Sequence, residues 1–226
     1  MIQKRIENRL CTDLQLLRDA FLSRTARRME KSSLETIRRA LRVAEQAHAG
    51  QTRDDGTPYM LHPLRIALCL MDELNQYDAG LLCVALLHDA IEDQGQMSAR
   101  FIAAEFGKAV VSDVLTLTKP DRCGRTREEV NRIYFKRLRG ANQRCRLIKL
   151  ADKLDNVRDA GNSPDLAKRQ RTISETRSFY IGVLLETLSE RRQRRIMADL
   201  LDRAIADLES RSRIGGTSKD GSCPQE

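Results

Sequence analysis

The sequence predicts an all-α fold, a bundle of about nine to ten helices with at most a short hairpin near residues 51–60. Ala, Leu, Arg and Glu are abundant, whereas aromatic residues make up 4% and Trp is absent, a composition that favours helix over sheet. Charged residues make up 32%, as is typical of amphipathic helices with one solvated face. Strand-like alternation is missing outside the turn-forming residues Asp55, Gly56 and Pro58, so the fold class follows from periodicity as well.

The first 30 residues are predicted to form an N-terminal amphipathic helical segment. Its apolar positions recur at helical spacing and are Ile2, Ile6, Leu10, Leu14, Leu17 and Phe21. Such a helix packs either on the core of its own chain or on a second copy. A homo-oligomer is therefore one of the partner states that the sequence leaves open.

Residues 31–211 form the predicted main domain, divided by helix-start and helix-stop signals. Ser32 with Glu35 fits a capping box for a helix that ends near Ala49, and Asp78 and Ser98 fit as later helix caps. The helix that begins after Ser98 is expected to end at a glycine. The later helices are expected over residues 108–118, 127–139, 142–160, 165–188 and 190–211. Residues 212–226 form a predicted disordered tail, because they are polar and rich in glycine.

The charge and cysteine content narrow the class of partner. The net charge is +8, but acidic residues are interspersed and aromatic side chains that stack on bases are scarce, which makes nucleic acid an unlikely main partner. The six cysteines form no C-x-x-C pair, so we expect reduced thiols, several of them buried. Neither a signal peptide nor an apolar run of about 20 residues is visible, and we expect a cytoplasmic protein without a membrane partner.

A His-Asp pair at the end of the most apolar helix is the first candidate site. In GLLCVALLHDAIED, His88 and Asp89 are followed by Glu92 and Asp93, which would lie one turn further along a continuing helix. Carboxylates this close repel one another unless a cation or a shared proton intervenes. A metal ion would resolve that conflict, although an isolated His-Asp pair also occurs by chance.

The segment IKLADKLDNVRD, residues 148–159, is the second candidate. Lys149, Asp152, Asn156 and Asp159 fall near one stripe of the expected helix. Asp152 lies between apolar neighbours and is a candidate to point inward. A solvated polar face is the more usual fate of such a stripe, and this segment alone favours that interpretation.

Three blocks together resemble the HD-type hydrolase domain of the RelA/SpoT family, which degrades the alarmones ppGpp and pppGpp. AHAGQTRDDGTPYMLHP, ALLHDAIED and KLADKLDNVRD are similar to the family's AHxGQxRxxGxPYxxHP, ALLHDxxED and KLADRLxNxR, in the same order. The resemblance covers roughly residues 35–185 and implies an HD-domain helical bundle. The residues that follow are too few for a synthetase domain, so we expect a standalone small alarmone hydrolase.

The resemblance implies a metal-dependent release of the 3′-pyrophosphate that leaves GDP or GTP. The implied metal ligands are His62, His88, Asp89 and Asp152. The implied ion is Mn²⁺, although the mixed imidazole and carboxylate donors also suit Fe²⁺ or Zn²⁺. Glu92 and Asp93 are the implied catalytic residues, which activate or orient the attacking water.

The substrate contacts are implied less directly. By resemblance, Arg53 lies at the base pocket and Asn156 contacts the nucleoside. The leaving pyrophosphate needs cations, for which Lys119 and Arg171 are candidates, together with Arg122 and Arg125 in the same loop as Lys119.

Some positions depart from the family pattern. Asp54 and Asp55 follow Arg53, where many members have a basic residue directly after the arginine. Asp155 stands where His or Tyr is usual, and we expect it to face solvent. We expect His48, in the AHxGQ block, to be a structural hydrogen-bonding residue rather than a metal ligand.

Three other functions stay open. Because Asp54 departs from the family pattern, the protein could instead be an HD phosphohydrolase that acts on another nucleotide, such as an adenosine alarmone or NADPH. A non-catalytic alarmone-binding sensor is a further alternative, against which Glu92 and Asp93 argue. A helical nucleic-acid-binding protein ranks last.

Overall fold

The computed structural model describes residues 12–91 and 98–214. These residues form nine α-helices and two short helical segments of other types. They contain no β-strand, only an isolated antiparallel bridge between Thr52 and Pro58 at the position of the expected hairpin. The all-α prediction is therefore confirmed.

The helices follow one another along the chain with short connections. They are α2 (Leu14–Arg28), α3 (Lys31–Ala47), α4 (Leu61–Asp72), α5 (Ala79–Leu87), α6 (Ala99–Leu117), α7 (Arg127–Arg139), α8 (Gln143–Ala160), α9 (Leu166–Glu175), the π-helical η1 (Thr176–Leu184), the 3₁₀ segment η2 (Leu185–Thr187) and α10 (Arg191–Ile214).

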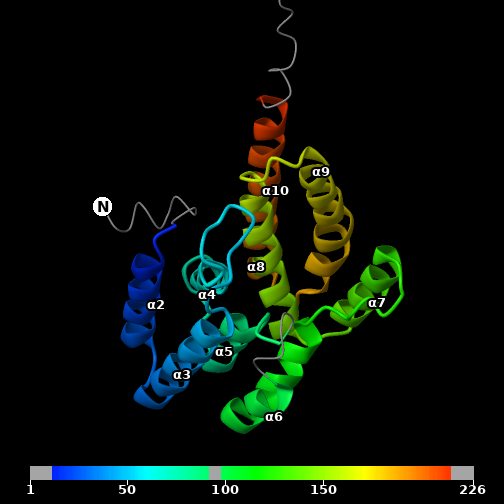
Figure 1. Cartoon of the computed structure of the whole chain (residues 1–226). Helices are drawn as coiled ribbons and strands as arrows, with labels where there is room; N and C mark the ends of the chain where they lie inside the picture. The colour runs from blue at the N-terminus through cyan, green and yellow to red at the C-terminus, as the bar shows by residue number, and fades with distance from the viewer. Residues whose placement is uncertain (1–11, 92–97, 215–226) are drawn as a thin grey trace, which may run out of the picture.

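Helix α8 is the centre of the bundle. Figure 1 shows α2 to α5 on one side of it and α9 and α7 on the other, with α6 at its lower end, whereas α10 overlaps it in this view. Contacts join α8 to α4, α5, α6, α7, α9 and α10. Because α8 is packed on several sides, its polar residues lie inside the molecule, where they need partners.

Helices α5 and α2 also contribute to the hydrophobic core. Every residue of α5 from Leu81 to Leu87 is buried, as its uniformly apolar sequence requires. Leu17 and Phe21 of α2 are buried in the same core cluster, and α2 contacts α3 and α4. The described part of the N-terminal segment therefore packs on the core of its own chain.

Most of the expected caps are present. The side chains of Asp78 and Ser98 accept hydrogen bonds from backbone N–H groups at the starts of α5 and α6. Gly107 interrupts α6 with φ of 85°, a conformation that glycine tolerates best.

The capping box expected at Ser32 and Glu35 is wrong. Helix α3 begins at Lys31 after Glu30, which makes no side-chain cap. Ser32 thus lies inside the first turn, where its carbonyl oxygen accepts a hydrogen bond from the Thr36 hydroxyl.

The end of the chain is less regular than expected. The helix predicted over residues 165–188 divides into α9, η1 and η2, and Phe179 of η1 stacks on Phe135 with ring centroids 3.8 Å apart. Helix α10 continues to Ile214, whereas the rest of the predicted tail, residues 215–226, lies outside the described residues. In residues 12–91 and 98–214, every helix is too short or too polar to cross a membrane.

Candidate metal centre and adjacent cavity

Three of the predicted metal ligands form one cluster, in which both histidines are buried and Asp89 is partly buried. Ligand atoms of His62, His88 and Asp89 all lie within 4.8 Å of one another, and each histidine is only 1% exposed. His62 lies in the first turn of α4, whereas His88 directly follows α5. Two helices from different parts of the core thus present imidazole and carboxylate donors to one point.

Asp152 brings the central helix to the same point. Its Oδ1 lies 3.1 Å from His62 Nε2 and 4.0 Å from His88 Nε2. Only 3% of Asp152 is exposed. The IKLADKLDNVRD stripe is therefore buried at Asp152, and the interpretation of this segment as a solvated face is wrong there.

The donor set fits a divalent cation. His88 Nδ1 lies 2.8 Å from the carbonyl oxygen of Ala85, to which it can donate. This contact leaves Nε2 as the acceptor nitrogen, and Nε2 is buried without a hydrogen-bond partner in the structure. An orphaned buried nitrogen beside two carboxylates is the arrangement that a metal ion satisfies.

The charges of the cluster point the same way. Burial by itself would lower the pKa of His62, but its contacts with Asp152 and Asp155 raise that pKa to about 9. Burial by itself would raise the pKa of Asp152, but Lys149 and His62 hold that pKa well below its usual range. The raised pKa of His62 and the lowered pKa of Asp152 have one cause: carboxylates that stay ionised in a buried site attract positive charge.

A second layer of side chains orients the cluster. The Tyr59 hydroxyl donates to Asp89 Oδ2 at 2.7 Å. Lys149 Nζ lies 2.6 Å from Asp152 Oδ2, and Asn156 donates to Asp152 Oδ1 at 2.6 Å. Such outer contacts fix the direction of ligand oxygens and are typical of metal sites.

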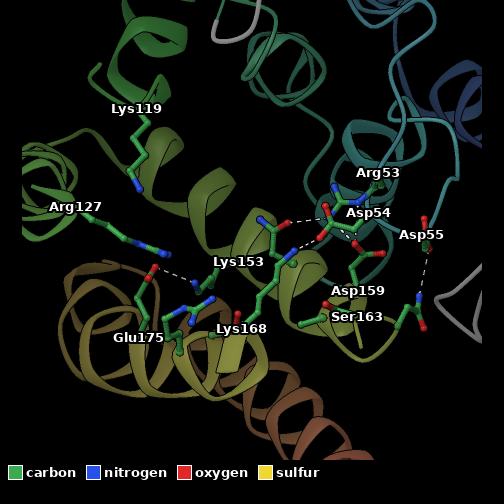
Figure 2. A pocket seen from close by; sticks show the side chains of 15 residues that line it. Arg53, Asp54, Asp55, Lys119, Arg127, Lys153, Asp159, Ser163, Lys168 and Glu175 are labelled. Atoms are coloured by element: carbon green, nitrogen blue, oxygen red, sulfur yellow. Dashed lines mark hydrogen bonds and ion pairs between the residues drawn. The ribbon is translucent and has the colours of Figure 1, made fainter. Parts of the chain in front are cut away.

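A cavity of about 820 Å³, including its open mouth, lies beside this cluster. All four predicted substrate-contact residues line it: Arg53, Asn156, Lys119 and Arg171. Figure 2 shows Lys119 and Arg127 pointing inward at one end and Arg53, Asp54 and Asp55 at the other. Asn156 joins the two regions, because it lines the cavity and also donates to Asp152.

The cavity is lined by six cationic and four carboxylate side chains. Arg53 donates to Asp159 Oδ2 at 2.9 Å and to Asn156 Oδ1 at 3.0 Å, which fixes its guanidinium plane. Lys153 Nζ donates to Glu175 at 2.9 Å, and Lys168 forms an ion pair with Asp54. The lining thus carries two more cationic than carboxylate side chains, and this excess of positive charge suits an anionic ligand.

Sequence reasoning missed part of this lining. Arg122 and Arg125 are absent from it, whereas Arg127, Lys153 and Lys168 are present. Arg127 is the first residue of α7 and lies two positions after Arg125, the last arginine of the predicted pyrophosphate-binding loop. Lys168 meets Asp54 across 114 residues of chain, and no local pattern announces such a contact.

The expectation that Asp155 faces solvent is wrong. Asp155 is 4% exposed. One of its oxygens lies 2.7 Å from His62 Nδ1 and the other 2.9 Å from Arg65 Nε. The reason is the central position of α8, which is covered on the side that carries Asp155.

The turn after α5 carries part of the predicted site, and other predicted residues lie away from the cluster. Helix α5 ends at Leu87, so His88 and Asp89 lie in a turn rather than in a continuing helix. Glu92 and Asp93, the predicted catalytic pair, lie outside the described residues. His48 stays out of the cluster: its Nδ1 lies 2.8 Å from Gln51 Oε1 and its ring stacks on Tyr59. Among the described cysteines, Cys69, Cys83 and Cys145 are buried and Cys123 is exposed.

Comparison with known proteins identifies the family of this chain. Residues 40–183 match the HD domain family, and the chain belongs to that family. The Escherichia coli (strain K12) bifunctional (p)ppGpp synthase/hydrolase SpoT is 36% identical over 157 residues, which cover 67% of this chain and 22% of that protein. A probable guanosine-3′,5′-bis(diphosphate) 3′-pyrophosphohydrolase of Mycoplasma pneumoniae is 32% identical over 160 residues, covering 66% and 21%.

A solved structure is similar over nearly its whole length. It is a metazoan ortholog of SpoT, described as hydrolysing ppGpp, with a TM-score of 0.65 and 25% identity, covering 74% of this chain and 94% of that one. By contrast, this chain spans only about a fifth of the length of the curated relatives it matches.

Proposed function

We propose that this protein hydrolyses the 3′-pyrophosphate of the guanosine alarmones ppGpp and pppGpp, giving GDP or GTP and pyrophosphate. The observation that carries the proposal is the junction of two features: a buried His-Asp cluster and a cation-rich cavity, joined by Asn156. The relatives named above as (p)ppGpp hydrolases support the choice of substrate. A nucleotide substrate is also the reason to propose a cytoplasmic location.

The proposed metal ligands are His62, His88, Asp89 and Asp152, and the proposed ion is Mn²⁺. When bound, such an ion lowers the pKa of a coordinated water and polarises a phosphoryl oxygen. The chain's own contribution is to hold the donors in place: Tyr59, Lys149 and Asn156 fix the two carboxylates. The hydrolytic unit is proposed to span residues 31–211.

The substrate is proposed to lie in the cavity with its base near Arg53 and its diphosphates near Lys119 and Arg171. Arg53 presents a planar cation that Asn156 and Asp159 already hold, which suits stacking on a purine. Water adds to the phosphorus on the ribose 3′-oxygen, and the bond from phosphorus to that oxygen breaks. The 3′-oxygen takes up a proton, and Glu92 or Asp93 is proposed to orient the water and accept its proton.

Another nucleotide is the second candidate substrate. Asp54, Asp55, Asp159 and Glu175 also line the cavity, and carboxylates oppose a ligand with two diphosphates. An adenosine alarmone and NADPH therefore belong in the panel of substrates that tests the proposal.

The test is a substrate panel with purified protein and Mn²⁺, in which metal content and product formation are measured on the same sample. We expect ppGpp to be the fastest substrate and GDP and pyrophosphate to form in equal amounts. Faster turnover of another nucleotide would reassign the substrate. Tight binding of ppGpp without cleavage would make the protein a sensor.

A further inference from the structure

We propose that Asp155 and Arg65 form a positioning pair that fixes the His62 ring with Nε2 directed at the metal ligands. The inference deepens the proposed function, since it rests on the proposed metal centre. It assigns a role to two buried residues outside the four predicted ligands.

The contacts define the orientation of His62. Its Nδ1 lies 2.7 Å from Asp155 Oδ2, and the other Asp155 oxygen lies 2.9 Å from Arg65 Nε. The side chains of His62, Arg65 and Asp155 are 2%, 10% and 6% exposed. An ionised carboxylate only accepts hydrogen bonds, so His62 must donate its hydrogen bond from Nδ1. Its Nε2 then faces Asp152 and Asp89 with a lone pair that can coordinate a cation.

The two histidines of the centre are held by different groups. His88 Nδ1 contacts a neutral backbone carbonyl oxygen, that of Ala85, whereas His62 Nδ1 contacts a charged carboxylate. A carboxylate behind an imidazole both selects the tautomer and makes the ring a stronger ligand. Asp155 is therefore expected to set the metal affinity of the centre more than any group behind His88.

Arg65 keeps the Asp155 carboxylate in this position. A buried carboxylate without a cation is costly, and Arg65 supplies that charge from α4, the helix that carries His62. Arg65 also lies 3.8 Å from Asp159, which in turn pairs with Arg53 at 2.8 Å. If Arg65 is removed, Asp159 thus retains a cationic partner.

An amide at position 155 would reverse the tautomer. In Asp155→Asn, Arg65 needs an acceptor and takes the amide oxygen, so the amide N–H₂ turns toward His62. His62 Nδ1 must then accept, and the proton moves to Nε2, where it blocks the metal. In Asp155→Asn with Arg65→Met, the amide oxygen is released from Arg65 and can rotate back to accept from Nδ1.

The experiment measures Mn²⁺ affinity by titration calorimetry on the full chain. We expect Asp155→Asn to weaken Mn²⁺ binding by about 10- to 100-fold, and Asp155→Asn/Arg65→Met to recover at least about threefold of that loss because its amide is free to turn. Unchanged affinity in Asp155→Asn overturns the proposal. A double variant that binds no better than Asp155→Asn also overturns it, because loss of charge alone would then explain the result.

Asp113→Asn is the matched control. Asp113 is likewise a buried carboxylate, with Arg144 at 3.2 Å and a hydrogen bond from Asn142 at 2.6 Å. Arg144 precedes Asp152 by eight residues on α8, about 12 Å along the helix. This variant is expected to lose stability but to keep wild-type Mn²⁺ affinity.

A measurement on the wild-type protein covers the case in which the variants do not fold. The chain has three histidines, so their ring nitrogens can be assigned by ¹H–¹⁵N NMR with diamagnetic Zn²⁺ bound. We expect a protected proton on His62 Nδ1 and a metal-bound Nε2. Coordination through Nδ1, or absence of that proton, overturns the proposal.

These outcomes separate this inference from the proposed function. Wild-type protein that binds Mn²⁺ but leaves ppGpp intact contradicts the function and leaves the affinity test of Asp155 valid. Wild-type protein that hydrolyses ppGpp while Asp155→Asn binds Mn²⁺ equally well contradicts only the positioning role. Wild-type protein that binds neither Mn²⁺ nor Zn²⁺ overturns both.

Discussion

The candidate metal centre and the adjacent cavity place the same residue types in opposite electrostatic surroundings. In the centre, carboxylates and imidazoles are buried and held by second contacts such as Tyr59 to Asp89 and Asn156 to Asp152. In the cavity, the charged groups surround open space, and exposed pairs such as Lys168 with Asp54 lie at its edge. Buried donors suit a small ion that demands fixed geometry, whereas a charged open lining suits a larger, solvated anion.

This difference predicts different consequences of mutation. A change in the centre should remove the metal and the activity together, because a buried ligand has no substitute. A change in the cavity should alter KM and leave the metal in place.

Removal of a proposed ligand should have the largest effect. We expect Asp89→Ala or Asp152→Ala to reduce ppGpp turnover by about 10³-fold or more, since metal-dependent stabilisation of the reaction is lost. Elemental analysis of the same sample should show less than one ion per chain. Asp113→Asn, a buried acid away from the centre, is the control and should retain both. Full activity in either ligand variant would contradict the assignment of that residue as a metal ligand that hydrolysis requires.

Changes at the proposed catalytic pair should separate chemistry from metal binding. Glu92→Ala or Asp93→Ala is expected to lower kcat by about 10²- to 10⁴-fold, the usual contribution of general acid–base catalysis, with metal content unchanged. Steady-state kinetics with elemental analysis test this. Undiminished kcat in both variants would remove their role in activating water.

A change at the wall of the cavity should affect substrate binding. Arg53→Ala is expected to raise KM for ppGpp by about 10- to 100-fold, the loss of one or two contacts to a charged group, while Mn²⁺ affinity stays near the wild-type value. Arg18→Ala, which removes an arginine paired with Glu45 at the surface, is the control. A fall in Mn²⁺ affinity in Arg53→Ala would show that the cavity wall and the centre are not separable.

The smallest effect is expected at the mouth. Asp54→Asn removes an exposed negative charge and releases Lys168, so KM for ppGpp should fall by about two- to fivefold at low salt, within the range of exposed ion pairs. Because such charges are screened, the gain should shrink as ionic strength rises. Kinetics at two salt concentrations test this, and a rise in KM would contradict it.

Local signals predicted much of the helical framework. Helix 127–139 was expected and is found as Arg127–Arg139; in the structure Thr126 and Glu129 form a capping box at its start, and Gly140 is its C-cap. The start of α3 was placed wrongly, since Ser32 resembles a cap but lies within the first turn. The π-helical η1 was not predicted, because no residue pattern marks the change from α-helical to wider hydrogen bonding.

The predicted ligands came together because three motifs carry them, but their surroundings did not follow from sequence. Asp155 was expected in solvent because helical periodicity assumes one solvated face. Helix α8 is instead packed on several sides, and this is a property of the whole bundle. The same reason hides Lys153 and Lys168, whose place in the cavity depends on α8, α9 and the loop before α4 meeting in space.

Ligands from α4, the end of α5 and α8 are proposed to share one metal ion. The most direct test of this proposal is a crystal soaked in Mn²⁺ and measured at the manganese absorption edge. We expect one strong anomalous peak in contact with His62 Nε2, His88 Nε2, Asp89 and Asp152. A crystal with no peak there, or with a peak that Asp152 does not contact, would contradict the account.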